Sequence, residues 1–445
     1  MRIYFPNRSH KSIVTRLFNA GLAAAQPDIA IGRYCKRRGE TLRVAKRTYQ
    51  LRSYNRIVCV GMGKASVPMV HALEQLLGNR LTSGLLVVKD FPQSMPLNIE
   101  GFQAGHPTPD NRSLKAAKAV QRLLGTLTHH DLLIALISGG TSSLIAAPAP
   151  GLTLSDKQRT TELLLRSGAS IQEMNVVRKH LSAVKGGQLA ASTSSTVISL
   201  ILSDVAGDDI ATIGSGPTAP DPTTHQQARR VLEQYNIWHV VPARVQQHIK
   251  QGIRGTVPET PKPGDPRLQR VQNIVIGNNQ SVIQQIKKTA KHLGFRPVIQ
   301  ETMFQGEAKE LGQSMAVLAK KIVLRNTGTR RPMCFIWGGE PTVRIKKSGQ
   351  GGRVQECVLA AAIGLAGLPN VIMAGLGTDG SDGPTDAAGA VVSGDTVRRA
   401  RLKGIDPQRA LNAHDSYRFF QDVGAHIKTG PTGTNVNDIY ILLTF

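Results

Sequence analysis

The amino-acid sequence predicts an α/β protein of two domains, the first a doubly wound, Rossmann-like parallel sheet and the second a smaller α/β domain. The 445 residues exceed the size of one ordinary domain. In the first half of the chain, short apolar runs alternate with helical segments, which is typical of βαβ units. The polar, proline-rich stretch 249–270 predicts a linker or long loop. We therefore expect the domains to span residues 1–248 and 271–445.

The individual elements follow from hydrophobic periodicity, in chain order. Apolar runs predict first-domain strands at residues 56–60, 85–89, 132–137 and 196–202. Helical spacing predicts helices at residues 11–25, 66–77, 111–127 and 155–165, and a basic helix within 175–190 that ends near Gly186 and Gly187. In the second domain we expect strands at residues 273–277, 333–337, 371–374 and 439–443, and helices at 281–293 and 355–365.

The net charge of +25 suggests nucleic-acid binding as one hypothesis. The basic residues are spread along the chain, however, and only 4% of residues are aromatic, so stacking platforms are scarce and we do not expect this partner. The densest basic stretch, 36–52, is interpreted as a solvated face. No apolar run approaches the roughly 20 residues that span a bilayer. Four distant cysteines without CxxC spacing favour the cytoplasm, and the protein is expected to be a monomer or homodimer.

A glycine-rich loop, Gly61 to Lys64, follows the first predicted strand and precedes a helix. Its amides could face an anion. The loop is neither a Walker A sequence nor a full GxGxxG fingerprint, because Ser66 occupies the last glycine position. Asp90, at the end of the next strand, keeps a dinucleotide-binding interpretation open. Gly61, Gly63 and Lys64 are therefore candidate site residues.

A second loop of small residues follows the third predicted strand, and its amides and hydroxyls could bind a phosphate or carboxylate. Its residues are Ser138, Gly139, Gly140, Thr141 and Ser142. An ordinary helix cap is the alternative. Asn175, Arg178 and Lys185 form a polar, basic group further along the chain. They predict either an anion site or a solvated helix face.

Acidic residues follow two other predicted strands. Asp204 and Asp208 come after the fourth strand, and Asp379, Asp382 and Asp386 lie in a glycine-rich loop after the strand at 371–374. Carboxylates at the carboxyl end of a sheet can hold Mg²⁺ or orient hydroxyls. They also occur in simple turns.

Two more candidates lie in glycine-rich segments of the second domain. Glu340 follows the strand at 333–337. Arg353 stands at a helix start, where its guanidinium could bind a phosphate or carboxylate through two hydrogen bonds.

Nine segments carry a resemblance to a known family. They are residues 60–65, 106–110, 138–144, 175–187, 203–221, 338–343, 351–356, 377–390 and 429–438. In this order they resemble the class II glycerate kinases, whose C-terminal region, here about 332–445, is called MOFRL. The resemblance covers nearly the whole chain from about Lys11. One departure is Val354, where the family usually has asparagine.

The resemblance implies a kinase that uses ATP and Mg²⁺ to phosphorylate D-glycerate at its 2-hydroxyl, with the active site in the interdomain cleft. It implies Lys64 and Arg353 as the functional pair. We expect Mg²⁺ ligands among Asp204, Asp208, Asp379 and Asp382, with Asp204 or Asp379 accepting the hydroxyl proton. Members of the family are also labelled hydroxypyruvate reductases, so an NAD(P)H-dependent reductase is the alternative.

Overall fold

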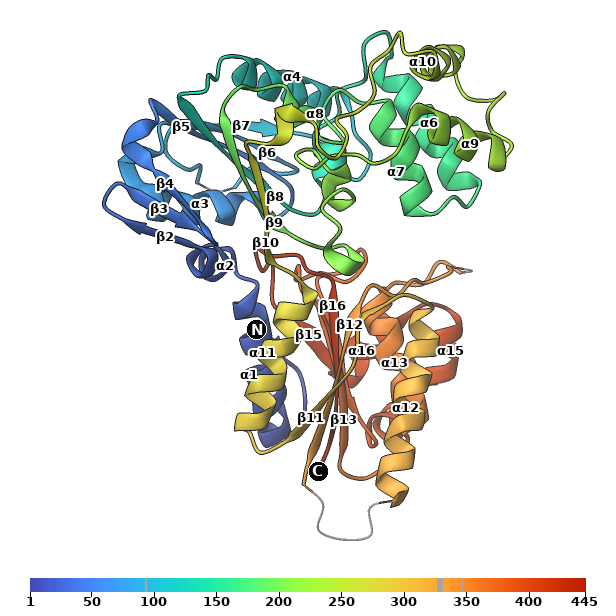
Figure 1. Cartoon of the computed structure of the whole chain (residues 1–445). Coiled ribbons are helices and arrows are strands. Elements are labelled where there is room, and N and C mark those ends of the chain that lie inside the picture. The colour runs from blue at the N-terminus through green and yellow to red at the C-terminus, as the bar shows by residue number, and fades with distance from the viewer. Residues whose placement is uncertain (93, 326–330, 346) are drawn as a thin grey trace. The chain divides into compact units, whose positions relative to one another are not determined.

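The structure is a computed structural model that describes residues 1–92, 94–325, 331–345 and 347–445. It divides into two compact α/β units, as the sequence predicts (Figure 1). The parallel-sheet unit is Pro27–Ile276, and the mixed-sheet unit combines Met1–Gln26 with Gly277–Phe445. These boundaries differ from the expected ones. The first 26 residues join the second unit, and the expected linker lies inside the first.

The parallel-sheet unit is built on six strands in the order β10-β9-β8-β5-β6-β7. The strands are β5 (Arg56–Met62), β6 (Ser83–Val88), β7 (Ile99–Gln103), β8 (Asp131–Ile137), β9 (Thr196–Leu202) and β10 (Val271–Gly277). The pairs β5·β6, β5·β8, β6·β7 and β8·β9 are all parallel. Chain order reverses direction between β5 and β8, so the sheet is doubly wound, as predicted.

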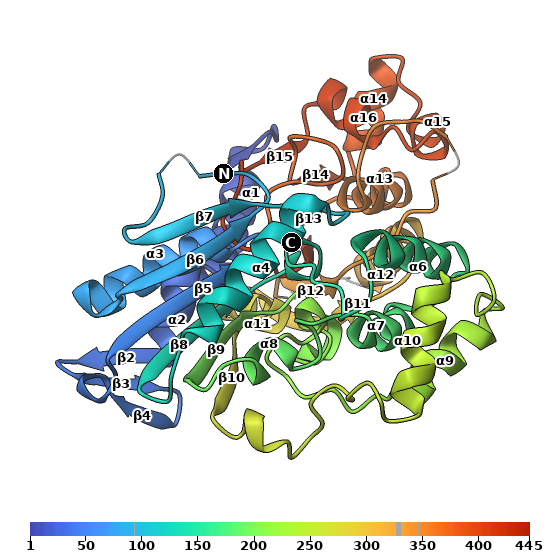
Figure 2. The ribbon, with the colours of Figure 1, turned by 90° about the horizontal axis from the view of Figure 1, so that it is seen from above.

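Helices cover both faces of this sheet. The helix α3 (Ser66–Leu77) packs on one face together with α2 (Pro27–Tyr34), and α4 (Asn111–Gly125) packs on the other (Figure 2). The three-stranded sheet of β2 (Cys35–Arg38), β3 (Thr41–Val44) and β4 (Arg47–Gln50) was not predicted. It contains most of the basic stretch 36–52, and the sheet's apolar residues Cys35, Leu42 and Val44 are buried in the core around α3.

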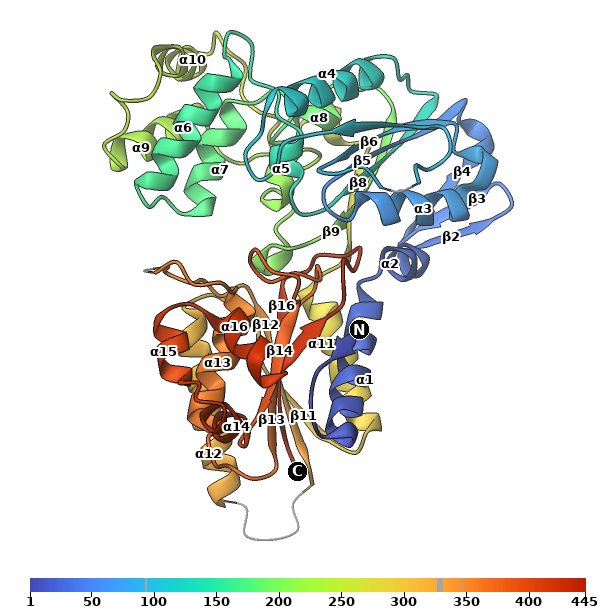
Figure 3. The same cartoon turned by 180° about the vertical axis from the view of Figure 1, so that it is seen from behind.

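A group of helices extends the unit around its own apolar cluster (Figures 2 and 3). It consists of α6 (Leu154–Arg166), α7 (Ile171–His180), α9 (His225–Gln234) and α10 (Ala243–Ile253). The short helices α5 (Thr141–Leu144) and α8 (Gln188–Ala191) lie nearer the sheet. The expected helix within 175–190 ends instead at His180, and the chain then turns at Gly186 and Gly187, which have positive φ.

The expected linker 249–270 is tied into the parallel-sheet unit. Glu259 accepts hydrogen bonds from the ring of His180 at 3.0 Å and from the backbone N–H of His225 at 2.9 Å. The Thr260 hydroxyl donates to the buried carboxylate of Asp221 at 3.0 Å. The prolines therefore shape a surface segment that returns the chain to the sheet as β10.

The mixed-sheet unit has seven strands in the order β1-β15-β14-β13-β16-β12-β11. Its strands are β1 (Arg2–Ile3), β11 (Arg296–Phe304), β12 (Met333–Gly339), β13 (Val371–Gly377), β14 (Gly389–Ser393), β15 (His426–Lys428) and β16 (Asp438–Thr444). Among the strand pairs formed by the described residues of this unit, only β11 and β12 are parallel.

Helices also flank this second sheet on both faces (Figure 3). One face is covered by α1 (Arg8–Ala24) and α11 (Asn279–His292). The other is covered by α12 (Ala308–Arg325), α13 (Arg353–Leu365), α14 (Thr396–Leu402), α15 (Pro407–Asn412) and α16 (Ser416–Val423). The apolar face of α1 packs on α11, which explains why the N-terminus belongs here. Within the described residues, no helix is long and apolar enough to cross a membrane.

Candidate active site

The loops after β5 and β8 meet at the point where the strand order reverses. The backbone N–H of Lys64 donates to the carbonyl of Gly139 at 2.9 Å, and that of Ala65 donates to the hydroxyl of Ser138 at 3.0 Å. Doubly wound enzymes bind their ligands at this position, outside the carboxyl ends of the strands. The structure therefore joins the two predicted glycine loops into one candidate site.

The glycines of the two loops have different roles. Gly63 has φ +114°, and a Cβ there would overlap the hydroxyl and carbonyl of Ser138. Gly140 has φ +90°, and a Cβ would lie 3.1 Å from the His106 ring. Both positions need glycine because the loops approach so closely. Gly61 is a packing position, where a Cβ would lie 2.9 Å from Leu86.

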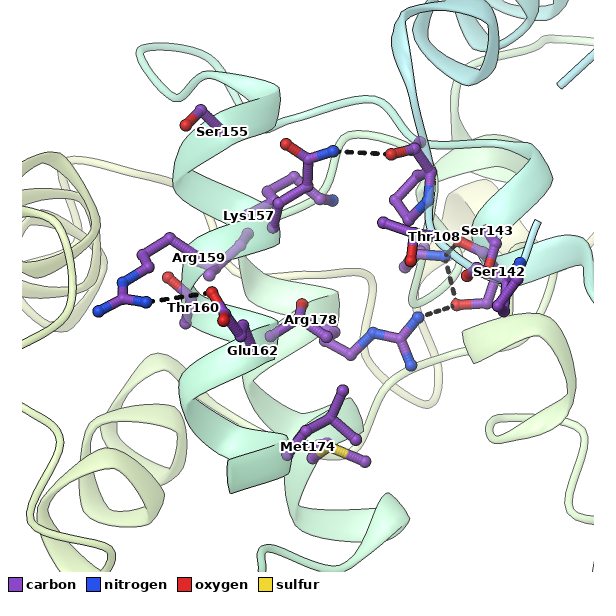
Figure 4. A pocket seen from close by; sticks show the side chains of 18 of the residues that line it. Thr108, Ser142, Ser143, Ser155, Lys157, Arg159, Thr160, Glu162, Met174 and Arg178 are labelled. Atoms are coloured by element: carbon purple, nitrogen blue, oxygen red, sulfur yellow. Dashed lines mark hydrogen bonds and ion pairs between the residues drawn. The ribbon is translucent and has the colours of Figure 1, made fainter. Parts of the chain in front are cut away.

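The loop hydroxyls also divide into two groups. Ser138 and Thr141 are buried, and the Thr141 hydroxyl donates to the Ser138 carbonyl at 2.7 Å. These two hold the loops together. Ser142 instead accepts from the Arg178 guanidinium at 2.5 Å and from Lys185 Nζ at 2.8 Å (Figure 4). It also contacts the Ser215 hydroxyl at 2.9 Å.

In the polar and basic group on α7 and after it, Asn175 and Lys185 are buried and Arg178 is half-buried, so the solvated-face interpretation is wrong for these residues. Asn175 and Lys185 are 4% and 3% exposed. The Asn175 amide oxygen accepts from the Ser215 hydroxyl at 3.1 Å and from Arg178 at 3.4 Å. Burial lowers the pKa of Lys185 well below its ordinary value, and the nearby Arg178 lowers it further.

Lys157 on α6 was not predicted, yet it belongs to the same cluster. Its side chain is buried, and its Nζ donates to the Ala147 carbonyl at 3.3 Å. Burial, followed by the charge of Arg178, lowers its pKa to about 7. Nothing in the sequence distinguishes this lysine from the exposed basic residues of the same helix.

These cations line a pocket of about 750 Å³ between α6, α7 and residues 107–109 (Figure 4). We call it the cation pocket and define its base as Lys157, Arg178 and Lys185. Among the residues that the structure describes, no carboxylate lies within ion-pairing distance of these three. Buried charges without a counterion are costly, so the pocket is suited to an anionic ligand.

The acidic candidates of this unit lie on the loop after β9. Asp204 and Asp208 are half-buried there, and Asp208 has φ +56° in a short 3₁₀ turn. Within the described part of the chain, no three His, Cys, Asp or Glu residues are grouped as a metal site. Carboxylate oxygens suit Mg²⁺, which commonly takes one or two of them and completes its shell with water and substrate phosphates.

In the mixed-sheet unit, Arg353 is the first residue of α13 and is held by two carboxylates. Its Nε and one terminal nitrogen donate to Asp438 at 2.6 and 3.1 Å, and the other donates to Glu340 at 2.6 Å. Burial raises the pKa of Asp438, although Arg353 opposes the shift. Sequence reasoning missed Asp438, which is the last residue of the family-like segment 429–438.

The three aspartates of the loop after β13 have separate environments. Asp382 is buried and caps α13, because its carboxylate accepts from the backbone N–H groups of Val354 at 3.0 Å and Gln355 at 2.8 Å. Asp386 is exposed and pairs with Lys428 at 2.7 Å. Asp379 is half-buried and accepts from the backbone N–H of Ser381 at 3.1 Å. Both oxygens of Asp382 are thus engaged in the cap.

A doubly wound sheet with glycine-rich loops at its switch point is the architecture of α/β enzymes that bind small molecules at this position. Residues 13–250 match the family described as "Domain of unknown function (DUF4147)", and residues 333–438 match the MOFRL family. A glycerate 2-kinase of Pyrococcus horikoshii is 40% identical, with 97% of each chain covered. The chain therefore belongs to the glycerate kinase family that contains these two regions.

A solved structure and a differently labelled relative complete the comparison. The crystal structure of a Thermotoga maritima glycerate kinase matches with a TM-score of 0.86 and 38% identity, covering 99% of this chain and 100% of that one. An Agrobacterium vitis relative that carries a hydroxypyruvate reductase label is 38% identical over 99% of this chain and 96% of its own length.

Proposed function

We propose that the protein transfers the γ-phosphoryl group of ATP to the 2-hydroxyl of D-glycerate, giving 2-phosphoglycerate. One observation carries the proposal. Arg178 and Lys185 both donate hydrogen bonds to the hydroxyl of Ser142, beside the loops that follow β5 and β8. The chain that carries them matches glycerate 2-kinases over nearly its full length. Both substrates are anions, and such a loop-and-cation arrangement is suited to them.

Phosphoryl transfer depends on positioning and charge neutralisation more than on covalent chemistry. We assign Lys64 and Arg353 to neutralising the carboxylate of glycerate and the transferring phosphoryl group. Lys64 extends from a loop whose backbone is fixed by Gly139, and Arg353 is oriented by Asp438 and Glu340. Fixed cations stabilise developing negative charge without having to reorganise.

Mg²⁺ would neutralise part of the negative charge of the ATP phosphates. The carboxylates of Asp204, Asp208 and Asp379 are suited to hold it, whereas the carboxylate of Asp382 caps the N-terminus of α13. Asp204 or Asp379 is proposed to accept the proton of the 2-hydroxyl. A carboxylate in this role must come within about 2.6–3.2 Å of the hydroxyl when the substrate is bound.

The direct test is incubation of the purified protein with ATP, Mg²⁺ and D-glycerate, with the product isomer identified by ³¹P NMR. We expect 2-phosphoglycerate. Lys64→Ala and Arg353→Ala should each lose most of kcat/KM while keeping the wild-type circular dichroism, and Lys115→Ala on an exposed face of α4 is the control. The proposal fails if no phosphoglycerate forms while another glycerate kinase is active in the same assay.

A reductase is the second candidate, favoured by the dinucleotide-type strand order and by the label of the Agrobacterium relative. Against it, the first loop lacks the third glycine of the fingerprint, having Ser66 there. Oxidation of NADH by hydroxypyruvate, followed at the nicotinamide absorbance band, separates the two activities.

A further inference from the structure

The base of the cation pocket has more basic side chains than a single carboxylate needs. Lys157, Arg178 and Lys185 converge there, and their nitrogens donate to uncharged oxygens of Ala147, Ser142 and Asn175. Glycerate brings one negative charge, whereas the phosphates of a nucleoside di- or triphosphate bring three or four. Charge matching therefore favours a polyphosphate at this base.

The size of the pocket leads to the same ligand class. Its volume of about 750 Å³ lies within the range of pockets that enclose nucleotide-sized or drug-sized molecules. A three-carbon acid would leave most of this volume to water. The pocket lies wholly inside the parallel-sheet unit, since all its lining residues fall between Pro107 and Lys185.

Two of the residues that line the pocket are exposed aliphatic residues. Leu165 and Ile171 are 60% and 46% exposed, although both are large aliphatic side chains at helix ends. Met174 lies deeper on α7, below the guanidinium of Arg178 (Figure 4). Exposed apolar side chains beside buried cations suit a ligand with an anionic end and a flat, apolar end.

We propose that the cation pocket binds the adenine nucleotide of the reaction, with its phosphates on Lys157, Arg178 and Lys185 and its adenine ring against the aliphatic side chains of Leu165 and Ile171. This inference rests on the proposed kinase function, which requires a nucleotide. It assigns Lys157, which neither the sequence motifs nor the two glycine loops include, to phosphate binding. It also separates the nucleotide from glycerate, which is left to the loop of Lys64.

The test is isothermal titration of the full-length protein with MgADP, with inorganic triphosphate and with D-glycerate. Lys157→Met should lower the affinity for MgADP and for triphosphate at least tenfold. It should change the affinity for D-glycerate less than threefold. Leu165→Asp should weaken the binding of MgADP but not that of inorganic triphosphate, because Leu165 would contact only the adenine ring. Lys115→Met, an exposed lysine of α4, is the matched control and should bind every ligand normally.

Folding of the Lys157 variant can be checked independently. The Ala147 carbonyl also accepts from the Ala183 backbone N–H at 3.0 Å and the Ser182 hydroxyl at 3.2 Å, so methionine leaves no unpaired carbonyl. The ligand-free variant should therefore melt at or above the wild-type temperature. A lower melting temperature would indicate that Lys157 serves the fold rather than a ligand.

Two results would overturn the proposal. One is wild-type MgADP affinity in Lys157→Met. The other is a selective loss of D-glycerate binding, which would assign the pocket to the acid substrate. If the wild-type protein makes phosphoglycerate and either result is obtained, only the pocket assignment fails. If MgADP binding depends on Lys157 but no phosphoglycerate forms, the pocket assignment holds and the proposed function fails.

Discussion

Replacing Asp382 with alanine should destabilise the mixed-sheet unit while leaving the Mg²⁺ requirement unchanged. The Asp382 carboxylate accepts from two backbone N–H groups of α13 and from the Gln355 side chain at 3.0 Å. Gly352, the residue that precedes α13, provides no side-chain cap of its own. Each buried N–H left without a partner costs about 1–3 kcal/mol. Removing one buried carboxylate offsets part of this, so we expect a net loss of about 2–4 kcal/mol.

The assay is thermal unfolding together with the Mg²⁺ dependence of the rate. For a unit of this size, 1 kcal/mol shifts Tm by about 2–4 °C, so the loss corresponds to roughly 4–16 °C. Asp382→Asn keeps one acceptor oxygen and should lose about half as much. Asp386→Ala is the control from the same loop. Its exposed pair with Lys428 should contribute less than about 1 kcal/mol.

The opposite pattern would refute this reasoning. If Asp382→Ala unfolds at the wild-type temperature but needs many-fold more Mg²⁺ for half-maximal rate, Asp382 is a metal ligand. Loss of stability at an unchanged Mg²⁺ requirement supports the cap. The two measurements are independent, because stability is measured without substrate and the Mg²⁺ dependence during turnover.

Three further predictions concern other parts of the molecule. Gly63→Ala should cost about 1–3 kcal/mol of backbone strain and lower activity, measured by urea unfolding and kinetics, because its φ is +114°. Asp438→Asn should lower kcat/KM at least tenfold by releasing Arg353, with a smaller loss in Tm; unchanged kinetics would contradict this. Burial lowers the pKa of His225 to about 4, so its neutral form is favoured in the fold. The resulting stability is present above pH 6.5 and is lost as pH falls toward 4, and His225→Gln should reduce this pH dependence in urea unfolding.

Strands buried on both faces were predicted well from the sequence. The expected strand 196–202 coincides with β9, because its apolar run, interrupted only by Ser199 after the initial Thr196, matches its burial. The strands β2 to β4 were missed for the opposite reason. Each is only four residues long, only β3 alternates apolar and polar residues, and the basic residues dominated the interpretation.

The chemical environment of the site residues could be predicted only in part. The glycine loops were found because a loop that follows a strand at the switch point is a local feature of the sequence. The cap by Asp382 joins residues 27 and 28 positions apart, and sequence spacing gives no sign of it. The core role of Val354 is likewise tertiary. It is fully buried, and only its backbone N–H meets Asp382, so valine in place of the family's asparagine leaves the cap intact.

The burial of Lys157 lowers the stability of the ligand-free protein and, under our proposal, raises its affinity for a polyphosphate. A pKa of about 7 instead of 10.5 corresponds to about 4–5 kcal/mol of destabilisation at neutral pH, an upper figure at 1.36 kcal/mol per pKa unit. Between pH 7 and pH 10.5 the folded protein binds fewer protons at Lys157 than the unfolded chain does, so stability should rise with pH over this range. Lys157→Met should abolish this rise.

A bound polyphosphate would reverse the destabilisation by supplying the missing counterion. A ligand at one hundred times its Kd stabilises the fold by about 2.7 kcal/mol. Saturating MgADP should therefore raise Tm clearly in the wild type and little in Lys157→Met, which starts from the higher value. Equal MgADP shifts in the two proteins at the same concentration would show that the charge of Lys157 faces no phosphate.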